Sequence, residues 1–202
     1  MKMKIGTDLD ECLAEFVSGF LDYHNNKYGT KLNRKEFKSY NLWETIGGTR
    51  EDAIKHVSEF YRTNYFKNLP VVFGSVNVVD LLSRENEIFV ISSRPIYIHN
   101  ETIKWLDDHF HEKFSEIFFS DEWNFSSWNF FNFRRKNKSG ICKKLKLDFY
   151  IEDNLGYALS CARKVDKVLL LDKPWNQNSE LPNNVHRVYG WNEILEKIEN
   201  GV

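Results

Sequence analysis

The protein has 202 residues, and its 28 Lys and Arg nearly balance 29 Asp and Glu, for a net charge of −1 at pH 7. This balance excludes a bulk field for wrapping nucleic acid or coating an anionic membrane, so any phosphate binding must be local. An aromatic content of 15% with only 10 Gly and 4 Pro excludes a disordered or low-complexity chain.

Short apolar runs typical of β-strands recur along the chain, with helix-like segments between them. The runs lie at residues 3–7, 87–92, 116–120, 148–152, 167–172 and 186–189. Helical apolar stripes are formed by Ile103, Leu106 and Phe110, and by Ile194, Leu195 and Ile198. Residues 89–91 and 168–171 are too apolar for half-exposed strands. The alternation predicts an α/β protein with an open, Rossmann-like parallel sheet covered by helices on both faces.

The first two predicted strands are separated by helix-like segments at residues 13–28 and 50–66, without a convincing strand. This is too much chain for one crossover helix. We therefore predict a helical cap at residues 16–73, inserted after the first strand. An α/β core is then formed by residues 1–15 and 74–202.

Polar residues follow several strands at their carboxyl ends, where open parallel sheets bind ligands. They are Asp8 and Asp10 after the first strand, Ser92, Ser93 and Arg94 after the second, Asp153 after the fourth, and Lys138 at the start of the preceding helical segment. Two carboxylates as close as Asp8 and Asp10 repel unless a cation or a shared proton offsets them, and Mg²⁺ prefers oxygen ligands. Each feature alone is common in turns and helix caps, and only the ordered combination is specific.

In this order the residues resemble the four motifs of the haloacid dehalogenase (HAD) superfamily, at residues 5–10, residues 89–92, Lys138 and residues 150–153. The cap position, the Ser-Ser-Arg-Pro sequence at 92–95 and the paired acids at 152–153 are similar to 5'(3')-deoxyribonucleotidase-like proteins. Glu11 stands where the superfamily usually has Gly, and Cys12 where it usually has Thr or Val. Glu11 is expected to point away as a helix-start residue, with contact to the cap as the alternative. Glu152 replaces a common Asp, which leaves its supporting role open.

The resemblance implies a Mg²⁺-dependent phosphomonoester hydrolase that works through an aspartyl-phosphate. Asp8 would attack phosphorus, and Asp10 would protonate the leaving oxygen and then activate water. Mg²⁺ would be held by Asp8, Asp153 and the backbone carbonyl of Asp10. The phosphate oxygens would be held by Ser92, Ser93 and Lys138. Because superfamily dehalogenases lack the second Asp, a phosphatase is expected.

The predicted cap is rich in aromatic residues, namely Phe16, Phe20, Tyr23, Tyr40, Trp43, Tyr61 and Phe66. Such side chains can stack on a base, which favours a nucleoside monophosphate as the small phosphorylated substrate. Tyr40, Trp43 and Arg94 are the candidate substrate contacts. The alternative is that the aromatic residues pack the cap helices, as the one-turn spacing of Phe16 and Phe20 favours.

Other readings remain open. The aromatic and basic residues at 121–138 suit the 3'-terminal phosphate of a nucleic acid, although the balanced charge argues against it and favours the alternative of a flexible loop with a few apolar anchors. Another phosphorylated metabolite, a nucleotide-sugar transferase and a catalytically weak nucleotide-binding module are further alternatives. No histidine has a visible partner for a role.

The cellular compartment is predicted from what the sequence lacks. Cys12, Cys142 and Cys161 have neither disulfide nor metal-site spacing, which favours a reducing compartment. Without a signal-peptide pattern or an apolar run of about 18 residues, we expect a cytoplasmic protein that does not enter membranes. The oligomeric state stays open.

Overall fold

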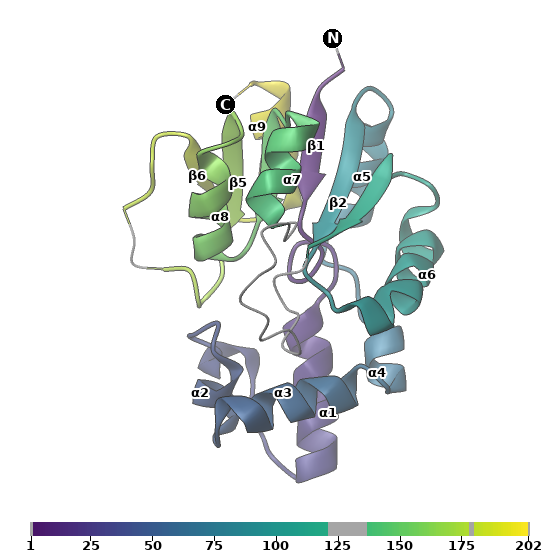
Figure 1. Ribbon diagram of the computed structural model, residues 1–202, viewed down its shortest axis with the longest axis vertical. Helices are drawn as coiled ribbons and strands as arrows, with labels where there is room; N and C mark the ends of the chain where they lie inside the picture. The colour runs from purple at the N-terminus through teal and green to yellow at the C-terminus, as the bar shows by residue number, and fades with distance from the viewer. Residues whose placement is uncertain (1, 121–136, 178–179, 202) are drawn as a thin grey trace, which may run out of the picture.

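The computed structural model describes residues 2–120, 137–177 and 180–201. Its centre is a parallel six-stranded sheet in the order β3-β2-β1-β4-β5-β6 (Figure 1). The strands are β1 (Lys4–Thr7), β2 (Glu87–Ser92), β3 (Glu116–Phe119), β4 (Phe149–Glu152), β5 (Lys167–Leu171) and β6 (Val185–Val188). Each lies within one or two residues of a predicted strand. Thr7 pairs with both Val90 and Ile151, so the end of β1 lies level with its two neighbours.

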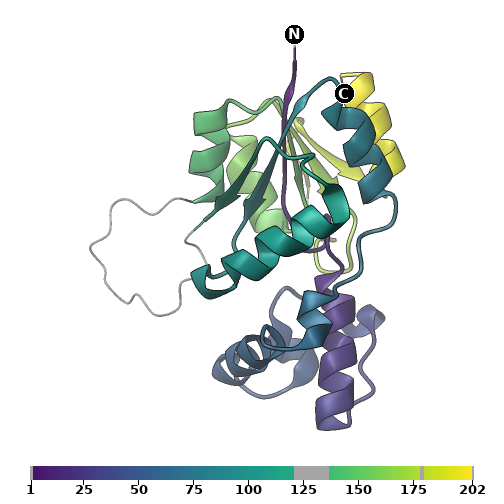
Figure 2. The same cartoon turned by 90° about the vertical axis from the view of Figure 1, so that its right-hand side faces the viewer.

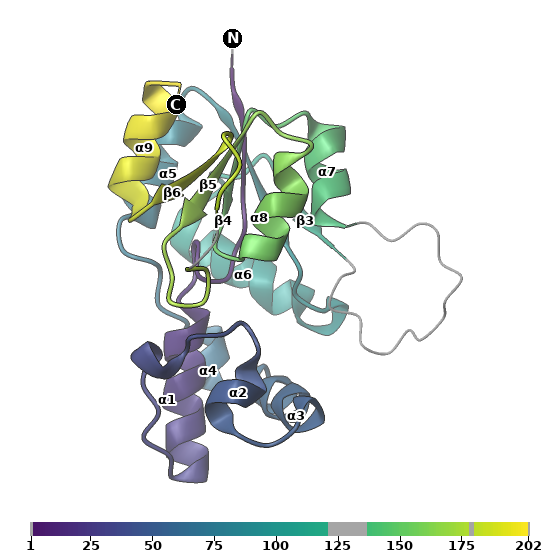
Figure 3. The same cartoon turned by 90° about the vertical axis from the view of Figure 1, so that its left-hand side faces the viewer.

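Helices cover both faces of the sheet (Figures 2 and 3). One face carries α5 (Ser75–Ser83), α6 (His99–Phe110) and α9 (Trp191–Glu199), and the other carries α7 (Lys138–Leu145) and α8 (Leu155–Ala162). In β2, Ile88 and Val90 belong to the core of the first face, whereas Phe89 and Ile91 belong to that of the second. Burial on both faces explains why the strands are continuous apolar runs.

The burial predicted for the apolar stripes of α9 and α6 is confirmed in the first helix and partly wrong in the second. In α9, Ile194 and Ile198 are buried, as predicted. In α6 the prediction for Ile103 is wrong: this side chain is 44% exposed. Thr102 and Trp105 are buried instead, and the Trp105 indole donates a 2.9 Å hydrogen bond to the Leu69 carbonyl.

The chain between β1 and α5 forms the expected helical insertion, which we define as α1 to α4. Its elements are α1 (Phe16–Tyr28), the short 3₁₀ turn η1 (Arg34–Glu36), α2 (Leu42–Ile46), α3 (Arg50–Phe60) and α4 (Asn64–Lys67). The segment predicted at 50–66 is two helices, because the Thr63 side chain caps a new start at α4. Phe20 meets Phe60 edge to face at 5.5 Å between ring centroids, so aromatic side chains hold the insertion together.

Two adjacent chain segments join the insertion to the sheet. The Val72 N–H donates to the Leu13 carbonyl at 2.7 Å, and the Glu15 N–H donates to the Pro70 carbonyl at 2.8 Å. The insertion therefore lies at the carboxyl ends of the strands (Figure 1). The division of the chain at residues 16 and 73 stays a prediction.

Two further expectations concern single segments. The aromatic and basic stretch predicted at 121–138 lies, up to residue 136, outside the described residues. Within the described ranges, none of the helices combines the length and the apolarity needed to cross a membrane.

Candidate active site

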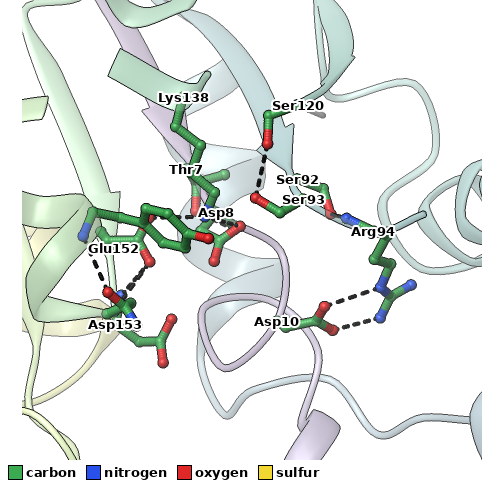
Figure 4. A network of polar contacts seen from close by, with 12 residues as sticks. Thr7, Asp8, Asp10, Ser92, Ser93, Arg94, Ser120, Lys138, Glu152 and Asp153 are labelled. Atoms are coloured by element: carbon green, nitrogen blue, oxygen red, sulfur yellow. Dashed lines mark hydrogen bonds and ion pairs between the residues drawn. The ribbon is translucent and has the colours of Figure 1, made fainter. Parts of the chain in front are cut away.

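Lys138 joins the ends of β1 and β4. Its Nζ lies 2.9 Å from Asp8 Oδ1 and 2.9 Å from Glu152 Oε2, and all three side chains are buried (Figure 4). Asn137 caps α7 by accepting the Gly140 N–H, which puts Lys138 at the first position of the helix. Burial alone would lower the pKa of Lys138, but the carboxylates of Asp8 and Glu152 hold that pKa well above its usual value. Lys138 is therefore a fixed positive charge.

Glu152 supports this arrangement. Its Oε2 also accepts the Tyr150 hydroxyl at 2.9 Å, and its Oε1 accepts the backbone N–H groups of Asp153 at 3.1 Å and Asn154 at 3.0 Å. Both oxygens are thus engaged by donors from the protein. The role left open by the sequence is to fix Lys138 and the turn that leads to Asp153.

Asp8, Glu152 and Asp153 form a buried acidic group, each with a carboxylate oxygen within 4.8 Å of the others. Burial, and then the charge of Glu152, raise the pKa values of Asp8 and Asp153 well above the usual range. Three carboxylates beside one ammonium leave negative charge that a cation would offset. Asp8 and Asp153 suit Mg²⁺, because Lys138 and the Trp175 indole contact one oxygen of each, whereas donors engage both oxygens of Glu152. Within the described residues, the Asp10 side chain is not part of this group.

Asp10 is instead paired with Arg94. The Arg94 Nη2 donates to Asp10 Oδ1 at 2.6 Å, and its Nε donates to Oδ2 at 3.1 Å (Figure 4). The third guanidinium nitrogen donates to Thr102 Oγ1 at 3.2 Å, and the guanidinium lies over the Phe66 ring at 4.7 Å. The structure therefore places Arg94, predicted as a substrate contact, against a predicted catalytic residue.

The two serines lie differently. Ser92 is buried, and its Oγ accepts the Arg94 backbone N–H at 3.2 Å. Ser93 lines the cavity between the sheet and the insertion, and its Oγ is 2.8 Å from Ser120 Oγ. Only Ser93 of the two thus borders the space that a phosphate would enter.

That cavity brings most of the predicted site residues together. Its walls include Asp8, Asp10, Glu11, Ser93, Arg94, Lys138 and Asp153, and, from the insertion, Phe16, Phe37, Tyr40 and Tyr61. Trp43 is not among the described residues that line it. Phe20 and Phe66 are buried in the packing of the insertion, as the packing alternative proposed.

Glu11 connects the site to the insertion. Its backbone φ is +63°, a left-handed conformation that favours Gly. Its carboxylate accepts the Val17 N–H of α1 at 2.7 Å, forms an ion pair with Arg34 of the insertion, and lies 3.3 Å from Lys173 Nζ. The expectation that Glu11 points away is wrong, because its buried side chain lines the cavity and pairs with the insertion, as the alternative proposed; its carboxylate also caps the start of α1.

Trp175 is a site residue that the sequence analysis missed. Its indole Nε1–H donates to Asp153 Oδ2 at 2.8 Å, and it lines the cavity. The available signal was its position, because Trp175 lies shortly after β5, at the same edge of the sheet as the other site residues.

The fold and the position of the site define the class of protein. A parallel sheet with a helical insertion after β1 and acidic residues at its carboxyl edge is the fold of haloacid dehalogenase-like hydrolases, and this chain has that fold. The haloacid dehalogenase-like hydrolase SP0104 from Streptococcus pneumoniae superposes with a TM-score of 0.69 at 12% identity, covering 98% of both chains. The HAD hydrolase YfnB from Bacillus subtilis, bound to magnesium, gives 0.67 at 11% identity, covering 98% of this chain and 99% of its own.

The sequence defines the family more closely. Residues 2–200 match the family of the 5' nucleotidase, deoxy (pyrimidine), cytosolic type C protein (NT5C), and the chain belongs to this family. A 5'(3')-deoxyribonucleotidase of Bacillus subtilis is 24% identical over 205 residues, covering 98% of this chain and 99% of the relative. The chain is therefore a nucleotidase with the fold of haloacid dehalogenase-like hydrolases, which confirms the predicted fold and class of enzyme.

Proposed function

We propose that the protein is a Mg²⁺-dependent phosphatase that hydrolyses nucleoside monophosphates through a phosphorylated Asp8. The observation that carries this proposal is the buried Lys138, held between Asp8 and Glu152 beside the Asp153 carboxylate. Such a site presents one oriented carboxylate, one fixed positive charge and an acidic group in need of a cation. These are the requirements of phosphoryl transfer to a carboxylate.

Each residue has a distinct part in the proposed reaction. Mg²⁺, held by Asp8, Asp153 and the Asp10 carbonyl, would neutralise charge on the transferring phosphoryl group. Asp8 attacks phosphorus, and Lys138 supplies positive charge to the phosphoryl oxygens. The Ser93 hydroxyl, at the cavity wall, donates to one of these oxygens. Ser92 Oγ accepts the Arg94 N–H and keeps its own O–H, which can donate to a phosphoryl oxygen.

Asp10 moves the protons. It donates one to the leaving oxygen, and the ionised carboxylate then takes one from the water that hydrolyses the phosphorylated Asp8. The bidentate contact with Arg94 suits the ionised state between these two transfers, since a guanidinium presents two donors to two carboxylate oxygens. Asp10 is partly exposed at the cavity, as a residue that reaches a leaving group must be.

The cavity wall supports a nucleoside as the leaving group. Phe16, Tyr40 and Tyr61 come from the insertion and face the carboxylates across the cavity. Aromatic rings in this position can stack on a base while the phosphate lies at Asp8. A cytoplasmic location is part of the proposal, in keeping with a family described as cytosolic.

The test is a hydrolysis panel of deoxynucleoside and ribonucleoside monophosphates, sugar phosphates and a 3'-phosphorylated oligonucleotide, each with and without Mg²⁺. We expect Mg²⁺-dependent phosphate release that is fastest with nucleoside monophosphates. Equal, low rates on all substrates would contradict the nucleotide assignment. The Asp8→Asn variant should be inactive, whereas the control Asp22→Asn, at an exposed position of α1, should match the wild type.

A further inference from the structure

Trp175 lies in the loop after β5, but its side chain packs against the insertion. Its ring packs against the small hydrophobic cluster of Val17, Leu21 and Phe37 in the insertion. The ring centroids of Trp175 and Phe37 are 6.2 Å apart in an edge-to-face arrangement, and the Arg34 guanidinium lies 5.8 Å from the Trp175 ring. The insertion therefore determines where this ring lies.

The polar end of the same side chain holds a proposed metal ligand. The Trp175 indole donates to Asp153 Oδ2 at 2.8 Å. The backbone of Asp153 is fixed separately, because its carbonyl accepts the Asn176 side chain at 2.7 Å. With the backbone fixed, the indole selects the rotamer of the carboxylate and leaves Oδ1 for another partner.

A second contact ties the same loop to the insertion. Lys173 Nζ lies 3.3 Å from Glu11 Oε2, and the same carboxylate forms the ion pair with Arg34. The loop after β5 thus meets the insertion directly through the ring contact and indirectly through Glu11, which pairs with both Lys173 and Arg34. A displacement of the insertion would release the ring contact and the Arg34–Glu11 pair.

We propose that Trp175 is a positioning residue through which the placement of the insertion sets the Mg²⁺ affinity of Asp153. This inference rests on the metal site of the proposed function. While Phe37 supports the ring, the indole keeps Asp153 oriented for the metal. Without that support the carboxylate must reorient on binding, which weakens binding. Because coupling is reciprocal, Mg²⁺ favours this placement of the insertion by the same factor.

The experiment is isothermal titration calorimetry of Mg²⁺ into the full chain without nucleotide. Trp175→Phe keeps an aromatic ring but removes the N–H, and we expect Mg²⁺ affinity to fall by about 10-fold. Phe37→Leu keeps the N–H but removes the ring contact, and it should lower the affinity in the same direction. The matched control is Phe60→Leu, a buried residue of the insertion whose ring contacts are with other aromatic residues there.

A spectroscopic signature distinguishes positioning from general loss of structure. Mg²⁺ should change the fluorescence of the wild type, and Trp175→Phe should lose this change although five of the six Trp residues remain. Hydrolysis by Trp175→Phe should recover at saturating Mg²⁺. Wild-type affinity in Trp175→Phe, or equal affinities in Phe37→Leu and Phe60→Leu, would overturn the inference. A wild type that neither binds nor requires Mg²⁺ would overturn the proposed function itself.

Discussion

Arg94 and Asp10 meet through two hydrogen bonds that join a guanidinium fork to a carboxylate, at 2.6 and 3.1 Å. The Arg94 side chain is 1% exposed, whereas that of Asp10 is 28% exposed. The buried Arg94 guanidinium therefore holds the partly exposed Asp10 carboxylate, and we call this pair the clamp. The clamp connects the loops after β1 and β2, and it fixes the direction in which Asp10 faces the cavity.

Arg94→Lys should reduce nucleotide hydrolysis, because an ammonium cannot form both hydrogen bonds with Asp10. We expect kcat to fall by about 10- to 100-fold, in the range of a weakened general acid. The loss should be smaller with p-nitrophenyl phosphate, whose leaving group needs little protonation. Steady-state kinetics on both substrates test this, with Arg84→Lys, in an exposed pair with Asp80, as the control. Equal losses on the two substrates would contradict a role through Asp10.

Glu152→Gln should destabilise the fold although the two side chains have the same shape. Lys138 and Tyr150 donate to one oxygen and two backbone N–H groups donate to the other, so the Gln NH₂ faces a donor in either orientation. We expect the free energy of unfolding to fall by about 3 kcal/mol, as when one partner of a buried ion pair is removed. Urea denaturation measures this loss. Glu59→Gln, which alters the more exposed pair with Lys27, should have a much smaller effect.

Substitutions of Glu11 separate backbone strain from ion pairing. Both Glu11→Ala and Glu11→Gly remove the contacts with Arg34, Lys173 and the Val17 N–H. Only Gly accepts a φ of +63° without strain. We therefore expect both variants to be less stable than the wild type. The free energy of unfolding of Glu11→Gly should exceed that of Glu11→Ala by about 1 kcal/mol. Thermal or urea unfolding can rank the three proteins, and an Ala variant as stable as the Gly variant would contradict the strain argument.

Stabilisation by Mg²⁺ should grow with pH. The pKa values of Asp8 and Asp153 are raised above 3.8 by burial and then by Glu152, so the folded protein retains protons that the unfolded chain has lost. The contribution of these two groups to the free energy of unfolding is complete below pH 3.8, their ordinary pKa. It falls as the pH rises through their raised pKa values in the folded protein. Mg²⁺ requires the ionised carboxylates, and it offsets the same repulsion.

The melting temperature, measured with and without Mg²⁺ at pH about 5 and about 8, tests this linkage. The increase caused by Mg²⁺ should be larger at the higher pH, and Asp153→Asn should abolish most of it. Melting temperatures with and without Mg²⁺ are compared at the same pH. The titration of groups distant from the metal, such as His24 and His186, therefore contributes equally to both and cancels. An increase that is the same at both pH values would count against a metal held by these carboxylates.

The strands that carry Asp8, Ser92 and Asp153 were predictable from the sequence, because strands buried on both faces are uninterrupted apolar runs. Parallel topology then brings their carboxyl ends to one edge, so the gathering of Asp8, Lys138 and Asp153 followed without any knowledge of contacts. The insertion followed likewise from the length of chain that lacked a strand signal. The exposed Ile103 could not be foreseen, since the face that α6 buries includes Thr102 and Trp105, whose partners Arg94 and Leu69 lie in other segments.

The side-chain contacts that orient the site residues were not predictable from the sequence. Asp10 and Arg94 are 84 residues apart, and Asp153 and Trp175 are 22 apart, in loops without a repeating pattern. Which side chains meet there depends on loop conformation and rotamers, not on periodicity. The role of Glu152 depends on four donors that come together only in the fold.

The paired hydrogen bonds at Leu13–Val72 and Glu15–Pro70 bring the two ends of the insertion to one point. A different helical unit could be joined at this point without altering the register of β1 with its neighbours. Such an exchange would also remove Phe37 from Trp175 and Arg34 from Glu11, so a new insertion would have to supply its own contacts to the loops of the sheet.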